Sequence, residues 1–90
     1  MARKITLQVF EDPGHGWARF PKDRLQALGI ADKISSYSYQ RGQYAFLEED
    51  GDLGVLCDAL RARGYEVKFK CAHTNRQSKI RGYQHYQVNG

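Results

Sequence analysis

The sequence predicts a single small α+β domain over residues 1–90, with an antiparallel or mixed sheet of about five strands and two short helices. Several short segments alternate apolar and polar residues, which is the period of a half-buried strand. Two other segments repeat apolar residues three and four positions apart, as one face of a helix requires. A hydrophobic content of 41% supports one modest core, and no repeat, linker or low-complexity segment divides the chain.

The first third of the chain predicts two strands and a helix. Residues 4–10 (KITLQVF) alternate apolar and polar side chains, and the turn sequence EDPGHG follows them. Residues 17–20 (WARF) form a short strand that leads into a helix over 21–29. Pro21 suits the first turn of that helix, and Gly29 suits its end.

A hairpin is predicted over residues 33–49, with its turn at Arg41-Gly42. Tyr37 and Tyr39 would share one face of its first strand, because side chains alternate along a strand. Two interpretations remain open: either the tyrosine pair fills the core, or this hydroxyl-rich segment recognises a partner. The opposite face would carry the polar side chains Ser36, Ser38 and Gln40.

The clearest helical pattern follows the hairpin. Four apolar residues have i, i+3, i+4, i+7 spacing, which predicts an amphipathic helix with one buried face. Asp50 and Asp52 offer caps and favourable charge at its start, and Gly64 offers a terminator. The four apolar residues are Leu53, Leu56, Cys57 and Leu60.

Residues 65–71 (YEVKFKC) alternate without a break and predict another strand. Cys57, on the helix face, and Cys71, in the strand, are both expected as buried free thiols. Thr74 and Gln77 have the spacing of a capping box, which predicts that a short helix starts there.

Charge is distributed unevenly along the chain, whose formal net charge is +4. Residues 43–60 contain five acids and no base, whereas residues 61–90 contain seven bases against Glu66 alone. The distribution predicts an acidic edge and a basic face. A basic face attracts phosphate backbones and also acidic proteins.

No motif predicts a metal site, a cofactor or an enzyme. The sequence has no paired Cys/His set at zinc spacing, no GxSxG nucleophile and no P-loop. One enzymatic alternative stays open, a small toxin-like ribonuclease in which histidines act as acid and base beside cations. Its residues would be His73, Lys79, Arg81, His85 and Tyr86.

The sequence also predicts a compartment. No apolar run approaches the roughly 20 residues of a membrane span. The N-terminal residues MARKITLQVF lack the apolar stretch and cleavage site of a signal peptide. We therefore expect no membrane association and a location in the cytoplasm.

Residues 16–49, GWARFPKDRLQALGIADKISSYSYQRGQYAFLEE, resemble the AbrB/MazE-type DNA-binding domains of bacterial regulators. The shared layout is a strand, a helix led by proline, the motif LGI, and two strands joined by a tight turn. The likeness covers under half of the chain, which adds a second helix and a further strand. It implies a DNA-binding role.

A broader likeness spans residues 14–86 and is carried by HGWARFPKDRLQALGIADKISSYSYQRGQYAFLEED and HTNRQSKIRGY. These segments resemble short, mostly uncharacterised proteins of phages and other mobile elements. The likeness implies a bacterial host and an accessory role, with no established chemistry.

The segment HTNRQSKIRGYQHY (73–86) is the leading candidate site. Ile80, Tyr83 and Tyr86 recur every third residue, which would hold one side of the segment against the domain and turn its cations toward solvent. We expect a non-enzymatic protein that binds nucleic acid or a nucleotide here. The expected anion-binding residues are His73, Arg76, Ser78, Lys79, Arg81 and Tyr83.

A second surface remains open for contact with a partner. The rival function is an anti-defence inhibitor that docks on a host protein in the manner of anti-CRISPR proteins, and a homodimer is also left open. The candidate contact residues are Arg19, Ser36, Tyr37, Ser38, Tyr39 and Arg41.

Overall fold

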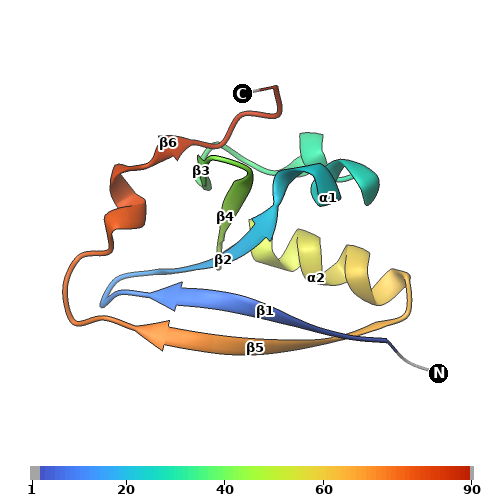
Figure 1. Cartoon of the computed structure of the whole chain (residues 1–90), viewed down its shortest axis with the longest axis horizontal. Helices are drawn as coiled ribbons and strands as arrows, with labels where there is room; N and C mark the ends of the chain where they lie inside the picture. The colour runs from blue at the N-terminus through green and yellow to red at the C-terminus, as the bar shows by residue number, and fades with distance from the viewer. Residues whose placement is uncertain (1–2, 90) are drawn as a thin grey trace.

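The computed structural model describes residues 3–89 and confirms an α+β fold. One mixed sheet has the strand order β5-β1-β2-β4-β3-β6 (Figure 1). β1 and β5 are parallel, and every other neighbouring pair is antiparallel. The strands are β1 (Arg3–Glu11), β2 (Gly16–Pro21), β3 (Tyr39–Arg41), β4 (Tyr44–Glu48), β5 (Tyr65–His73) and β6 (Gln84–His85), and the helices are α1 (Lys22–Ala27), η1 (Ala31–Lys33), α2 (Asp52–Ala62) and η2 (Lys79–Gly82), where η marks a 3₁₀-helix.

The first strands and helix lie where the alternation and the turn residues predict them. Pro21 is the N-cap of α1, with φ −62°, and Gly29 follows the helix with φ +75°. Only glycine adopts that left-handed conformation without a steric cost, so it ends the helix. None of the helices within residues 3–89 is long and apolar enough to cross a membrane.

The residue that caps the start of α2 differs from the two predicted, Asp50 and Asp52. The carboxylate of Glu48 accepts hydrogen bonds from the backbone N–H groups of Asp50, Gly51 and Asp52, at 2.8–2.9 Å. Asp52 is buried and turns away from the helix end, where it accepts from Ser35 and Ser38. Glu48 takes the capping role because the last residue of β4 lies directly over the first turn of α2.

The hairpin is shorter than predicted. β3 begins only at Tyr39, and residues 35–38 form a turn that is tied to α2 by Asp52. Tyr37 and Tyr39 therefore do not share a strand face: the Tyr37 side chain is 79% exposed, whereas Tyr39 is half-buried. The buried hydroxyl of Ser38 bonds to Asp52, which gives the polar side of this segment a structural role.

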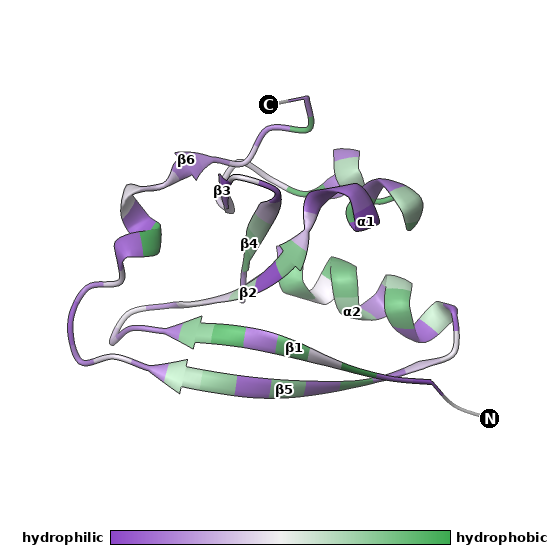
Figure 2. Ribbon diagram, in the orientation of Figure 1, coloured by the Kyte–Doolittle hydropathy of each residue, from purple (hydrophilic) through white to green (hydrophobic). Residues whose placement is uncertain are grey.

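The main core lies between one face of the sheet and the helices. α2 packs against β4 and β5, and apolar residues recur along its ribbon (Figure 2). Its buried residues Leu56, Cys57 and Leu60 belong to this core. The helical spacing of those residues therefore predicted the right face. The largest fully buried side chains of this core are Phe20, Leu25, Leu47, Leu56 and Leu60.

A smaller apolar cluster covers part of the opposite face of the sheet. Trp17, Phe46 and Ile80 are buried there, with η2 lying over the strands. The inward position of Ile80 and Tyr83 is confirmed. Tyr86 is also buried, but it joins the main core, where its hydroxyl donates to the carbonyl of Ala31 at 2.7 Å.

Two predictions for the region around β5 are wrong. Cys71 is exposed, because the C-terminal half of β5 extends beyond the part of the sheet that α2 covers. No helix starts at Thr74, whose hydroxyl instead accepts from the backbone N–H of Arg76. The short helix η2 begins at Lys79, capped by the hydroxyl of Ser78.

Candidate nucleic-acid interface

The sheet face opposite α1 and α2, here called the open face, is rich in cations. The alternation of β1 and β5 sends Ile5, Leu7 and Val67 to the helices and most of the polar residues of these strands to this side, where Phe10 and Ala72 also lie. The register then aligns the polar residues, since Thr6 lies opposite Lys68 and Gln8 opposite both Lys70 and Arg19. The exposed cations that the strands supply to the open face are Lys4, Arg19, Arg41, Lys68 and Lys70.

Aromatic rings lie among these cations. The guanidinium of Arg19 lies 5.6 Å from the ring centre of Phe10 and 5.3 Å from that of Tyr44. Arg41 lies 5.0 Å from the ring centre of Tyr83. Such contacts hold the arginine heads in place over rings that are themselves part of the sheet surface.

A pocket of about 350 Å³ lies at the end of β1 and β5. Phe10 and Ala72 of the open face line it together with the loop that follows β5. The end of β5, this loop and the start of η2 contribute four of the six expected anion-binding residues, His73, Arg76, Ser78 and Lys79, together with Thr74 and Gln77. Glu11 also lines the pocket, so its charge is mixed.

Within this group the side chains differ in what they already bind. The hydroxyl of Ser78 caps η2, and His73 Nε2 lies 3.2 Å from Asn75 Oδ1. Arg76 and Lys79 are exposed. These two cations are therefore the part of the expected anion site that faces solvent.

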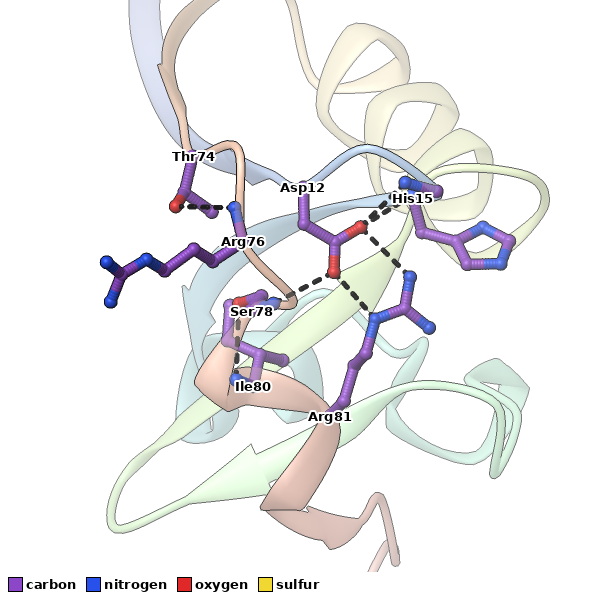
Figure 3. Close-up of polar contacts among 8 residues, drawn as sticks. Asp12, His15, Thr74, Arg76, Ser78, Ile80 and Arg81 are labelled. Atoms are coloured by element: carbon purple, nitrogen blue, oxygen red, sulfur yellow. Dashed lines mark hydrogen bonds and ion pairs between the residues drawn. The ribbon is translucent and has the colours of Figure 1, made fainter.

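Arg81 contradicts the expectation of a solvent-facing cation. Its Nε and Nη2 donate to the two carboxylate oxygens of Asp12 at 2.6 and 2.9 Å (Figure 3). The Arg81 side chain is 28% exposed and that of Asp12 only 1%. Asp12 also accepts from the backbone N–H of Ser78, so this ion pair fastens the C-terminal segment to the turn after β1.

The pKa values of this pair follow from its geometry. The hydrogen bond from Arg81, and then that from Ser78, hold the pKa of the Asp12 carboxyl well below its usual range. The same bond raises the pKa of Arg81. The sequence predicts only that Asp12 lies in a turn, because a contact between residues 12 and 81 has no local signal.

A second pocket, of about 490 Å³, lies on the other side of η2 and is called the aromatic pocket below. It brings together Tyr37 and Tyr39, from the expected contact set, with Arg81. His15 and Trp17 were not expected as site residues; their only signal was the glycine-flanked sequence GHGW. The lining residues are His15, Trp17, Tyr37, Tyr39, Glu48, Asp50, Gly51 and Arg81.

The remaining expected residues are divided between structure and surface. Ser36 is exposed, and its carbonyl accepts from His85 Nδ1 at 2.8 Å. Tyr83 is half-buried and packs against Phe46, with ring centres 5.2 Å apart. Its role in the fold is to hold η2 on the sheet, although one side of its ring meets Arg41.

The structure does not gather the residues of the ribonuclease alternative. His73 ends β5 and His85 lies in β6, and these strands are the two opposite edges of the sheet. Tyr86 is buried, and Arg81 is bound to Asp12. Within residues 3–89 no three His, Cys, Asp or Glu side chains come together as a metal site would require.

Comparisons with known proteins give no further guidance: no family model, no curated protein and no solved structure matches this chain.

Proposed function

We propose that this chain binds single-stranded nucleic acid across the open face of its sheet. The observation that carries the proposal is the charge of that face. Five strand cations lie on it, and Arg76 and Lys79 extend it at the pocket beyond β5. Of the acids on the same strand faces, Glu66 is exposed beside Lys4, and Glu48 is turned to cap α2.

The rings among the cations favour a single strand over a duplex. Unpaired bases stack on exposed aromatic side chains while cations follow the phosphates. Tyr44 is 43% exposed and carries Arg19 over its ring, which offers both contacts at one position. The likeness of residues 16–49 to AbrB/MazE-type domains supports a nucleic-acid partner, and the likeness to phage proteins supports a bacterial host.

The test replaces two exposed lysines of β5, in the variant Lys68→Ala/Lys70→Ala. Binding of a fluorescently labelled thymidine oligonucleotide is followed by anisotropy from 50 to 300 mM salt. We expect weaker binding and a salt slope lower by about 1.4 units, since each lost phosphate contact on a single strand contributes about 0.7. The melting temperature should hardly change, because exposed cations contribute little to stability.

The matched control removes the same charge from the helical side. Lys33 and Arg61 are exposed on η1 and α2. The variant Lys33→Ala/Arg61→Ala should keep the parent's salt slope. Its affinity should fall only by the small loss of long-range attraction that two fewer positive charges cause. If both double variants weaken binding equally, net charge and not the open face attracts the strand. If the parent protein does not bind the oligonucleotide, the proposal is wrong.

A second candidate function, docking on a host protein, is favoured by the edge of β5. β5 is an edge strand: no other strand within residues 3–89 pairs with the free edge of its nine residues. Phe69, on this strand, is 47% exposed. Such an edge can accept a strand of another protein. Binding of this kind would tolerate salt and would be lost in the variant Phe69→Glu, whereas oligonucleotide binding would not be.

A further inference from the structure

Three loops border the aromatic pocket: a buried aspartate holds two of them, and Glu48 holds the loop of Asp50 and Gly51. Trp17, at 2% exposure, and the half-buried Tyr39 form the pocket's fixed inner side. Both belong to the apolar cluster that includes Phe10 and Tyr83, the rings beneath Arg19 and Arg41. The pocket is therefore continuous with the open face.

Asp52 holds the loop that carries Tyr37. Its carboxylate accepts from the backbone N–H of Ser35 at 3.1 Å, from the Ser35 hydroxyl at 2.7 Å and from the buried Ser38 hydroxyl. The Ser35 hydroxyl in turn accepts from the backbone N–H of Tyr37 at 3.2 Å. These bonds order a loop whose one large side chain is 79% exposed and contributes nothing to the core.

Asp12 holds the opposite side. One of its oxygens accepts from the backbone N–H groups of Gly14 and His15, both at 2.9 Å, and the carboxylate fixes Arg81 beside the pocket. A side chain at position 14 would meet Arg81, since a Cβ there would lie 2.8 Å from Nη2. The glycine therefore allows the arginine to reach its place over the Trp17 ring, 5.2 Å from the ring centre.

The charged groups of the pocket differ in what they leave for a ligand. Arg81 uses Nε and one N–H of Nη2 on Asp12, which leaves the second N–H of Nη2 and both N–H groups of Nη1 as donors. Both oxygens of Glu48 are bound by backbone N–H groups of the α2 start. Within residues 3–89 no donor reaches the carboxylate of Asp50, which is thus an acceptor at the rim.

An aromatic surface with an arginine donor and a carboxylate acceptor, beside the hydroxyls of Tyr37 and Tyr39 and the imidazole of His15, matches a planar heterocycle better than an ion. A phosphate would meet the carboxylates of Glu48 and Asp50. A cation would meet Arg81, which already occupies the cation position over Trp17. A nucleobase is neutral, stacks on a tyrosine ring and presents donors and acceptors along its edges.

We propose that the aromatic pocket holds one unpaired base of the bound strand and prefers guanine. The N1–H and N2–H groups of guanine suit the Asp50 carboxylate, while its O6 and N7 suit the Arg81 guanidinium. Tyr37 stacks on the base, and the phosphates remain on the open face. This inference rests on the proposed function and adds a base preference to it.

The test compares oligonucleotides of nine nucleotides that carry thymine at every position except the central one. The central base is thymine, adenine, cytosine or guanine. Trp17 is the only tryptophan of the chain, so its fluorescence reports on the pocket while anisotropy reports on affinity. We expect the guanine oligonucleotide to bind at least about fivefold tighter than the others, which is the lower end for a bidentate base contact. It should also change the Trp17 emission more than the thymine oligonucleotide does.

Three variants locate the effect. Tyr37→Ala and Asp50→Asn should reduce the guanine preference below about twofold, with the salt slope unchanged because neither residue contacts phosphate. Tyr44→Ala is the matched control, an exposed tyrosine of the open face, and should weaken all four oligonucleotides by the same factor. Equal affinity of the parent for all four, or a preference that survives Tyr37→Ala, overturns the inference while leaving the proposed function standing.

Two further outcomes separate the inference from its premise. If no oligonucleotide binds, the proposed function is wrong, and this inference is wrong with it. If Trp17 emission responds to N-acetyl-arginine amide and not to guanosine, the pocket is a receptor for a cationic side chain of a protein, which also overturns the inference.

Discussion

The two faces of the sheet carry different kinds of side chain for different reasons. The helix-covered face buries mainly leucine, isoleucine, phenylalanine and alanine, and the removal of this apolar area from water stabilises the fold. The polar side chains buried on that side, Ser38, Gln40 and Asp52, all form hydrogen bonds. The open face carries five exposed cations interleaved with rings. The covered face accounts for folding, whereas most cations of the open face have no structural role that would explain them.

Arg81 is the exception that sharpens this comparison. It lies on the same side as Arg76 and Lys79 and is only eight residues from the end of β5, yet it is bound to a buried carboxylate. A cation on the open side can therefore belong either to the fold or to the surface. The distinction depends on whether a fixed acid faces it.

The largest effect is expected on the covered face. Leu56 has no exposed surface, so Leu56→Ala should lower the free energy of unfolding by about 2–5 kcal/mol. Urea denaturation followed by circular dichroism measures it. Tyr44→Ala, on the open face, should cost less than about 0.5 kcal/mol. Equal losses for the two variants would remove the distinction between the faces.

The next effect separates Arg81 from Arg76. Arg81→Ala leaves the buried carboxylate of Asp12 without its partner, so we expect a clear fall in melting temperature. Arg76→Ala should leave the melting temperature unchanged, because this side chain is exposed. Arg81→Lys keeps the charge but loses the bidentate hydrogen bond, so its melting temperature should lie between those of the two alanine variants. Thermal unfolding at pH 7 measures all three.

A pH dependence follows from the lowered pKa of Asp12. An unfolded aspartate takes up its proton near pH 3.9, whereas the folded one resists protonation. The stability that Asp12 contributes is therefore fully present above about pH 5 and lost as the pH falls below about 4. We expect the melting temperatures of the parent and Asp12→Asn to converge in acid. A constant difference from pH 7 to pH 2 would contradict this account.

The smallest effect concerns the two cysteines. Cys57 is buried in the main core, where burial raises the pKa of its thiol, whereas Cys71 is exposed on β5. Under native conditions we expect a thiol reagent to modify Cys71 rapidly and Cys57 only through unfolding. Peptide mass spectrometry of the labelled protein identifies the site. Rapid labelling of Cys57 would contradict the packing of α2.

The outcome for Cys71 shows how far alternation along a strand can predict burial. Alternation correctly places Tyr65 and Val67 toward the helices. It cannot show where the covering helix ends, so Phe69 and Cys71, two and four residues further along the same face, emerge into solvent. Burial depends on the length of α2 relative to β5, which is a property of the packed structure.

The sequence by itself determined the α+β class, the face of α2 that is buried and the glycines that end both helices. Each of these follows from local periodicity or from a backbone angle that only glycine adopts freely. Only the tertiary structure decided which cations are surface and which are structural. It also placed His15, Trp17 and Tyr37 around one pocket. Pairs such as Asp12 with Arg81 and Asp52 with Ser38 are far apart along the chain, and a local pattern contains no information about which distant residue completes a buried polar group.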